Sequence, residues 1–183
     1  MNTQSTYSRF TTRETGTIAL QLLCNTQLGD WVRSTSKLSV ERFRKFIDET
    51  IISTDITATS YELDLFDVHQ RLVKGLPGAA ILIASALAFD TFQEGEVFFS
   101  VSSWTARQRI GKRLKPDEGE KALRLVHVLL LATRYFGAEA ARAYLRTPNY
   151  ALGGMTPKDL LRTFEGERLV MNELATHFDS GAV

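Results

Sequence analysis

The sequence is poor in several features that would announce a function. Its 183 residues contain one cysteine and four prolines, and the formal net charge is only +1. The single cysteine, Cys24, excludes a disulfide within the chain and fits a reducing compartment, so we expect a free buried thiol there. The near-zero net charge gives no indication of what kind of partner the protein binds. The hydrophobic share of 44% is enough to bury the core of a globular domain.

Long hydrophobic runs are missing as well. The longest run of low polarity, "GLPGAAILIASALAF" at residues 75–89, is too short to span a bilayer and begins with helix-breaking residues. The first 17 residues are polar and lack the apolar stretch of a signal peptide. We therefore expect a soluble, cytoplasmic protein.

Patterns typical of an active site are few. The histidines lie far apart with no second type of metal ligand nearby, which argues against zinc; they are His69, His127 and His177. Gly111–Lys112 lacks the rest of a phosphate-binding loop, and no Gly-x-Ser-x-Gly is present. We predict no catalytic, metal or cofactor residue, and no enzyme. His127 is predicted to be a hydrogen-bonded core or interface histidine.

Helical periodicity dominates what is present, and the predicted fold class is all-α. An amphipathic helix capped by Ser39 is predicted over residues 39–51, after a polar start at 1–16 and an undecided segment at 15–23. Residues 53–65 are predicted to form a loop or a short extended piece. Pro116 and the acids that follow it predict the start of a long central buried helix that Gly137 ends.

A second set of helix signals follows the central helix. A shorter helix is predicted over residues 138–146, ending at Thr147–Pro148. Thr156 with Pro157 predicts another start, and Thr163 a further one. The last residues, "DSGAV", break the helical pattern, and we expect them to reach outward.

The charge distribution changes abruptly near residue 97. Residues 55–96 contain seven acids and two bases, whereas residues 97–116 contain five bases and no acid. Read as a helix from Ser102 or Ser103, "SSWTARQRIGKRL" could be the DNA-reading helix of a helix-turn-helix, with Trp104 and Ile110 facing the core. Residues 81–100 would then supply an earlier helix and a turn near Gly95. The candidate DNA contacts are Ser103, Thr105, Arg107, Gln108, Lys112 and Arg113. A solvated charged face is the alternative.

The stretch "RTPNYALGG", residues 146–154, breaks the helical pattern most strongly. It ends a helix, turns at Pro148–Asn149, and is expected to expose Tyr150 and Leu152 beside two glycines, which permit backbone shapes that other residues resist. From the residues alone it could be a corner between packed helices or a surface that another molecule binds.

This stretch carries a resemblance to a known family. "RTPNYALGGMTPKDLLRTFEGERLVMNEL", followed by "FDSGAV", resembles the C-terminal toxin-binding domain of the Xre/MbcA/ParS antitoxins. The family pattern is matched at Tyr144, Leu145, Pro148, Asn149, Ala151, Leu152, Gly154, Pro157, Leu160, Leu161 and Gly166. The likeness extends upstream through the helix after Pro116 to about Gly75. Gly119 stands where a serine is usual, Tyr144 replaces a tryptophan, and the ending "HFDSGAV" departs from the family's usual tail.

The resemblance implies an antitoxin that is not itself an enzyme. Its partner would be a RES-domain toxin that consumes NAD, whose NAD cleft the antitoxin covers with its C-terminal end. We expect Asp179 or the Val183 carboxylate to pair with a cationic group of that cleft. The resemblance also implies a homodimer that, with toxin, represses its own operon by binding operator DNA. The candidate toxin contacts are Arg146, Pro148, Asn149, Tyr150, Leu152, Gly153, Gly154, Phe178, Asp179 and Val183.

Three regions are predicted on this basis. Residues 1–65 form an extension of unknown role, residues 66–115 an Xre-like helix-turn-helix region, and residues 116–183 the toxin-binding domain. Two rival interpretations remain open: a stand-alone helix-turn-helix transcription regulator without a toxin, and an interaction scaffold whose basic helix no longer binds DNA.

Overall fold

The helices of the C-terminal two-thirds of the chain are described by a computed structural model. It describes residues 69–70, 72–76 and 78–180, except for the side chains of Arg134 and residues 178–180. The predictions for Cys24, for residues 15–23, 39–51 and 53–65, and for Val183 therefore lie outside the described residues. The elements are α5 (Ala79–Ala88), α6 (Phe92–Phe99), α7 (Ser103–Gln108), α8 (Pro116–Phe136), α9 (Ala138–Arg146), the 3₁₀ helix η2 (Tyr150–Leu152), α10 (Pro157–Leu160) and α11 (Phe164–Ser180). The predicted all-α class is confirmed.

Helix α8 is the central element, as predicted. Pro116 occupies its first turn, and the Glu118 carboxylate accepts a hydrogen bond of 3.0 Å from the backbone N–H of Lys115, which satisfies a donor at the helix start. Gly137, with φ of 82°, ends it. The middle of α8 is buried along most of its length, including Leu125, Val128 and Leu129.

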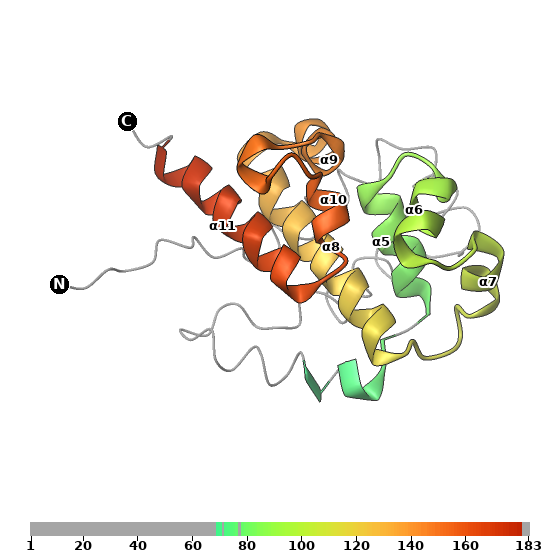
Figure 1. Cartoon of the computed structure of the whole chain (residues 1–183). Helices are drawn as coiled ribbons and strands as arrows, with labels where there is room; N and C mark the ends of the chain where they lie inside the picture. The colour runs from blue at the N-terminus through green and yellow to red at the C-terminus, as the bar shows by residue number, and fades with distance from the viewer. Residues whose placement is uncertain (1–68, 71, 77, 181–183) are drawn as a thin grey trace.

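Two groups of helices cover α8 from different sides. Helices α5, α6 and α7 lie on one side, and α9, α10 and α11 on the other (Figure 1). Helix α8 packs directly against α5, α9 and α11. The largest fully buried side chains come from both groups and from α8 between them: Phe89, Phe98, Ile83, Leu87, Leu125, Leu129, Leu145, Leu161 and Leu174. Among the described residues, no helix combines the length and apolar composition that crossing a membrane requires.

The predicted turn near Gly95 is wrong. The chain turns at Asp90–Thr91, where the Thr91 hydroxyl and the Glu94 carboxylate cap the start of α6 reciprocally. Gly95 lies inside α6 and is buried, and a Cβ there would lie 2.5 Å from the Ser85 hydroxyl. The glycine therefore serves close packing of α6 on α5, and the sequence pattern alone does not separate that role from a turn.

Helix α7 is shorter than predicted, and its packing is different. It begins after Ser100, whose φ of 55° is left-handed, with Ser102 as its cap, and it ends at Gln108. Trp104 is 68% exposed and Ile110 39% exposed, so the expectation that they face the core is wrong. In less than two turns α7 buries only the small Ala106, and Ile110 falls in the turn beyond the helix.

The helix starts predicted near the C-terminus are confirmed. Helix α9 spans Ala138–Arg146, and the Thr156 hydroxyl caps α10 by accepting from the backbone N–H of Asp159 at 3.2 Å. The Thr163 hydroxyl accepts from the N–H of Gly166 at 3.1 Å at the start of α11. Helix α11 continues through Asp179 and Ser180, so the expected break at Asp179 comes too early. No glycine or proline stands between Gly166 and Gly181 to stop the helix sooner.

Candidate functional site

The corner between α9 and α10, residues 147–156, closes on itself through the backbone of Asn149. The Asn149 N–H donates to the Met155 carbonyl at 3.0 Å, and the Asn149 carbonyl accepts from Leu152 at 3.0 Å and Gly154 at 2.9 Å. Gly153 and Gly154 have φ of 69° and 79°, a region that residues with a Cβ avoid. The two glycines thus allow the chain to fold back on Asn149.

The side chain of Asn149 is held at both ends. Its Oδ1 accepts from the N–H of Ala151 at 2.9 Å, and its Nδ2 donates to Oε1 of Glu173 on α11 at 2.6 Å. The first bond fixes the start of η2, and the second ties the corner to α11. Asn149 of the Pro-Asn pair that the sequence singled out therefore anchors the corner.

Glu173 is a buried acid that the sequence analysis missed. Its side chain is 4% exposed and accepts hydrogen bonds from the hydroxyl of Tyr144, from Nδ2 of Asn149 and from Nε2 of His177 at 2.6 Å. Burial and the Glu173 carboxylate both raise the pKa of the Tyr144 hydroxyl, which stays protonated and donates. The spacing of four between Glu173 and His177 on one helix was the available signal.

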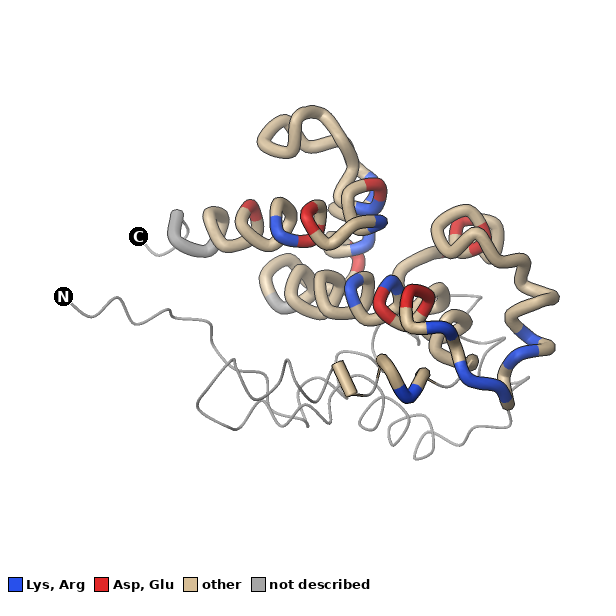
Figure 2. The backbone as a smooth tube through the Cα atoms, turned by 60° about the horizontal axis from the view of Figure 1, so that its bottom comes forward, with Lys and Arg blue, Asp and Glu red and all other residues tan. Residues whose placement is uncertain are grey.

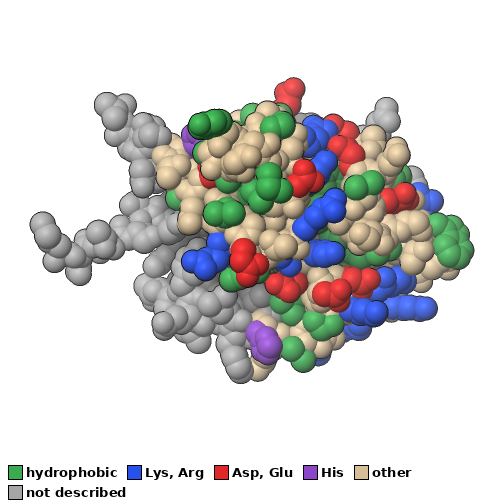
Figure 3. All heavy atoms as spheres, in the orientation of Figure 1, with side chains coloured by type: hydrophobic (Ala, Val, Ile, Leu, Met, Phe, Trp, Pro, Cys, Tyr) green, Lys and Arg blue, Asp and Glu red, His purple; other side chains and the backbone are tan. Residues whose placement is uncertain are grey.

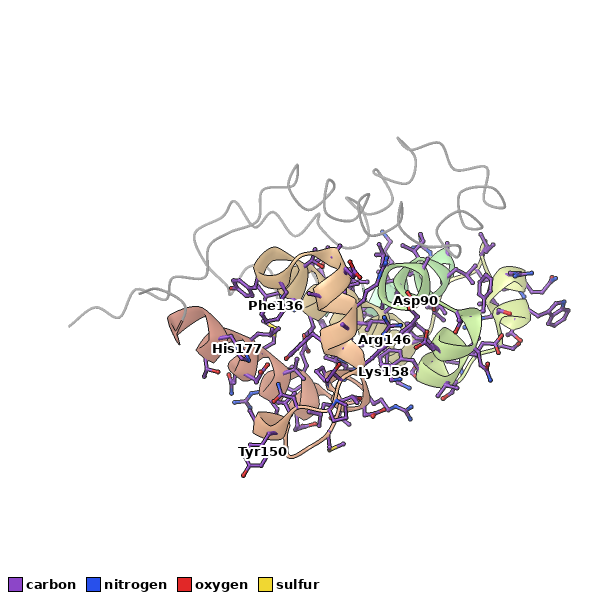
Figure 4. All side chains as sticks on the ribbon, turned by 90° about the horizontal axis from the view of Figure 1, so that it is seen from above. Asp90, Phe136, Arg146, Tyr150, Lys158 and His177 are labelled. Atoms are coloured by element: carbon purple, nitrogen blue, oxygen red, sulfur yellow. The ribbon has the colours of Figure 1, made fainter. Side chains whose placement is uncertain are left out.

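The corner presents one aromatic side chain to solvent. Tyr150 is 98% exposed, and its side chain points away from the body of the molecule (Figure 4). Pro148, Gly153 and Gly154 are also exposed. Leu152 was predicted to be exposed but is only 8% exposed and belongs to the core. The single turn of η2 carries Tyr150 outward and Leu152 inward.

Arg146 faces away from the corner's exposed side. Its guanidinium pairs with the Asp90 carboxylate and lies 3.8 Å from Oε1 of Glu94, so it binds the α5–α6 turn (Figure 4). One turn earlier on α9, Nε of the buried Arg142 donates to the Leu87 carbonyl at 3.0 Å. The structure thus gives Arg146 an internal partner, and separates it from Tyr150.

Two of the predicted tail contacts, Phe178 and Asp179, lie at the far end of α11. Phe178 and Asp179 fall in its last turn, directly after His177, whose ring centroid is 6.0 Å from that of Phe136. Figure 4 shows His177 and Phe136 close together, at the end of the domain remote from Asp90. The corner and the tail are therefore separate surfaces joined by α11.

The start of α7 is occupied by an acid. The backbone N–H of Ser103 donates to Oε1 of Glu96 at 2.6 Å, and this bond holds the pKa of the Glu96 carboxyl below its usual range. The Thr105 hydroxyl lies 2.8 Å from that of Ser102. A carboxylate at the positive end of α7 stands where a DNA-reading helix would bring base edges or phosphates.

Some basic side chains of this region face solvent, and others form hydrogen bonds within the chain. Arg107 and Gln108 are exposed on α7, with the Arg107 guanidinium 5.1 Å from the centroid of the Phe92 ring. Lys112 is exposed in the following turn, whereas Arg113 donates from Nη1 to the Gly75 carbonyl at 2.8 Å. Lys and Arg positions follow the segment from α7 to α8, with acids directly after them (Figure 2). Their side chains gather at the lower right in Figure 3.

His127 is exposed, so the core alternative predicted for it is wrong, whereas the predicted hydrogen bond is present. Its Nδ1 lies 3.2 Å from Oε1 of Glu167 on α11, and its side chain is 55% exposed. His69 and His177 are also exposed and lie on other elements. No cluster of three metal-binding side chains occurs within the described part of the chain.

The fold and the site together define an all-α protein with a pinned, solvent-facing corner. Residues 131–177, which include that corner and Glu173, match the family of the antitoxin Xre/MbcA/ParS C-terminal toxin-binding domain. The resemblance predicted from the sequence is therefore confirmed over this segment. Searches of curated proteins and of solved structures gave no match. The family match supports an antitoxin role for the chain and implies a toxin as its partner.

Proposed function

We propose that the chain binds and neutralises a RES-domain toxin by covering the toxin's NAD cleft. The observation that carries this proposal is the match of residues 131–177 to the toxin-binding family, because the matched segment encloses the corner and its anchor on α11. A rigid corner with an exposed aromatic is a suitable docking element, since few aromatic anchors usually dominate an interface.

The proposed contact has two parts. The first is the corner, where Tyr150 and its exposed neighbours Pro148, Gly153 and Gly154 face solvent. The second is the C-terminal tail, where Asp179 in the last turn of α11 or the Val183 carboxylate, outside the described residues, pairs with a cation that would otherwise bind an NAD phosphate. If Arg146 also contacts the toxin, its guanidinium must first leave the Asp90 carboxylate. Leu152 is buried, so it contributes by supporting the corner from inside.

The experiment expresses the gene adjacent to this one, with and without this chain, while cellular NAD and growth are followed and complexes are co-purified. The proposal expects NAD to fall with the adjacent gene alone and to recover when this chain is present and bound. A chain lacking residues 178–183 should bind but neutralise poorly. An unchanged NAD level and no co-purifying protein would remove the proposed function.

Tyr150→Ala tests the corner directly. Loss of an exposed aromatic anchor at an interface costs about 2 kcal/mol or more, so we expect affinity for that toxin to fall about 30-fold or more. Because Tyr150 packs on nothing in the free chain, the melting temperature should not move. The matched control is Val97→Ala, which removes an exposed apolar side chain on α6. Equal affinities for both variants would contradict docking at the corner.

We also propose that the chain represses its own operon as a homodimer that binds operator DNA through α7 and the turn after it. The exposed bases Arg107 and Lys112 favour this, and Glu96 at the start of α7 opposes it. Binding to the DNA upstream of the gene should weaken steeply with salt, and Arg107→Ala should reduce the slope of log K against log salt by about one. No binding at low salt would favour the interaction scaffold, and DNA binding without any toxin partner would favour the stand-alone regulator.

A further inference from the structure

We infer that Glu173 is a positioning residue that sets the corner and the C-terminal turn of α11 in one arrangement for toxin docking. The inference rests on the proposed function, and it concerns a residue outside the predicted contact surface. Glu173 is almost fully buried, so it acts through the residues that it holds.

The three donors around Glu173 come from three different places in the fold. Tyr144 lies on α9, Asn149 on the corner, and His177 one turn further along α11. The ion-pair contact of Glu173 within the described residues is with His177. A buried carboxylate is tolerated only when its oxygens are hydrogen-bonded, so the three donors and Glu173 hold one another in place.

Each of the three donors lies close to a part of the proposed toxin contact. Asn149 has its other amide end on the N–H of Ala151, so Glu173 fixes the plane of the amide that shapes η2 and orients Tyr150. His177 directly precedes Phe178, and its ring and that of Tyr144 both contact Phe136, with centroids 6.0 and 5.5 Å apart. One acid thus reaches both parts of the proposed docking surface.

Two substitutions at Glu173 separate positioning from bulk packing. Glu173→Met keeps the length of the side chain but leaves Asn149, Tyr144 and His177 without their acceptor. Glu173→Gln keeps an oxygen for Asn149 and His177, which share Oε1, and its amide N–H can donate to the Tyr144 oxygen because a phenol hydroxyl also accepts. We expect the first variant to lose the arrangement and the second to retain it.

The matched control is Leu174→Ala on the same helix. Leu174 is fully buried, so its truncation destabilises α11 without removing a hydrogen bond of the corner. All variants are compared in the full chain, at a temperature at which each is folded by circular dichroism. Amide exchange of Ala151 and Gly154 is measured relative to amides of α5, and affinity is measured for the toxin identified by the adjacent-gene experiment.

Glu173→Met is expected to speed corner exchange at least tenfold relative to α5 and to weaken toxin binding at least tenfold. For Glu173→Gln and Leu174→Ala, corner exchange relative to α5 and toxin affinity should both stay within about threefold of the wild-type values. Unchanged corner exchange in Glu173→Met would overturn the inference, and so would faster exchange with unchanged affinity. An affinity loss for Leu174→Ala equal to that for Glu173→Met would mean that Glu173 contributes only ordinary packing, and it would also overturn the inference.

If Glu173→Met does not fold, Tyr144→Phe carries the test, because it deletes a single donor oxygen. Corner exchange and affinity should then change in the same direction by a smaller factor, and no change in either would overturn the inference. If the wild-type chain binds no toxin, the proposed function fails and the docking role fails with it. Corner exchange in the same variants then still reports whether Glu173 holds the corner, so the two failures are distinguishable.

Discussion

Gly166 shows how closely two backbones approach at the start of α11. A Cβ at this position would lie 1.9 Å from the Leu160 carbonyl oxygen and 2.5 Å from its carbon. Both are backbone atoms, so no side-chain rotation relieves the contact. The adjacent Thr163 hydroxyl caps α11 through the Gly166 N–H, which fixes the position further.

Gly166→Ala is therefore expected to destabilise the chain, although alanine favours helix more than glycine does. Overpacking costs about 1–3 kcal/mol, which corresponds to a fall in melting temperature of roughly 2–4 °C per kcal/mol for a chain of this size. Thermal unfolding followed by circular dichroism measures it. Gly111→Ala is the control, because a Cβ there meets nothing within 4 Å. A rise in the melting temperature of Gly166→Ala would contradict the prediction and would show that the backbone between α10 and α11 shifts at little cost.

Single residues were predicted well where their own chemistry decides their position. Local backbone rules that the sequence reveals were enough to place Pro116 and Pro157, the capping Thr156 and Thr163, and the glycines at 137, 153 and 154. Trp104, Leu152 and Glu173 were missed or misplaced. Their burial depends on which face of a short element meets a distant helix, and periodicity over one or two turns does not determine that.

The junction between α7 and α8 depends on one ion pair. The Arg109 guanidinium donates to both oxygens of Glu118, at 2.7 and 2.5 Å, and joins the end of α7 to the first turn of α8. These bonds from Arg109 are the main reason that the pKa of the Glu118 carboxyl lies below its usual range. Because Arg109 is engaged in this way, it is not available as a free cation for DNA.

This ion pair predicts an acid-sensitive contribution to stability. A carboxyl whose pKa is lowered by folding stabilises the chain fully above its unfolded pKa of about 4.3, and that stability is lost as pH falls through the lower folded value. Glu118→Gln should therefore flatten the decline of unfolding free energy between about pH 5 and pH 3. Urea unfolding across that range measures the slope. Glu165→Gln, at an exposed acid on α11, should leave the slope unchanged. Parallel slopes for wild type and Glu118→Gln would contradict the prediction.

Elements with two clear end signals were predicted closely, and those without were not. Helices α8 and α9 have proline or glycine at their boundaries and match the predicted ranges. Helix α7 has a good cap at Ser102 but no stop signal, so its end at Gln108 was missed. There the chain bends because Arg109 turns toward Glu118, nine residues further on, and because the Lys112 carbonyl accepts from the backbone N–H of Gly78, which is distant in sequence.

At the scale of the whole molecule, α9 joins the two groups of helices. The Arg142 side chain caps the end of α5 at the Leu87 carbonyl, and Arg146 pairs with Asp90 in the turn that follows. Burial lowers the pKa of the Arg142 guanidinium, and the nearby Asp90 opposes that shift. The predicted helix-turn-helix and toxin-binding regions are thus linked by side chains as well as by α8.

Arg142→Met is expected to weaken that link while it keeps the apolar bulk of the side chain. Leaving a buried carbonyl without its donor costs about 1–3 kcal/mol, so the free energy of unfolding should fall by that amount. Urea unfolding measures it, and Arg168→Met at an exposed position of α11 is the control. Exchange of amides in α5 should rise together with exchange in α9. A rise in α9 alone would indicate that the two groups unfold separately.

The position of α8 between the two groups also has a consequence during synthesis. The ribosome releases α5 to α8 before α9 and α11, so of the described helices that pack directly against α8 a nascent chain at first has only α5. Until α9 and α11 emerge, the apolar side chains of α8 that these two helices cover lack those partners, and exposed apolar surface of this kind is what chaperones and proteases bind. The segment that matches the toxin-binding family, residues 131–177, contains α9 and most of α11, which complete the packing of α8. We therefore expect a chain cut short before α9 to be degraded faster than the full chain.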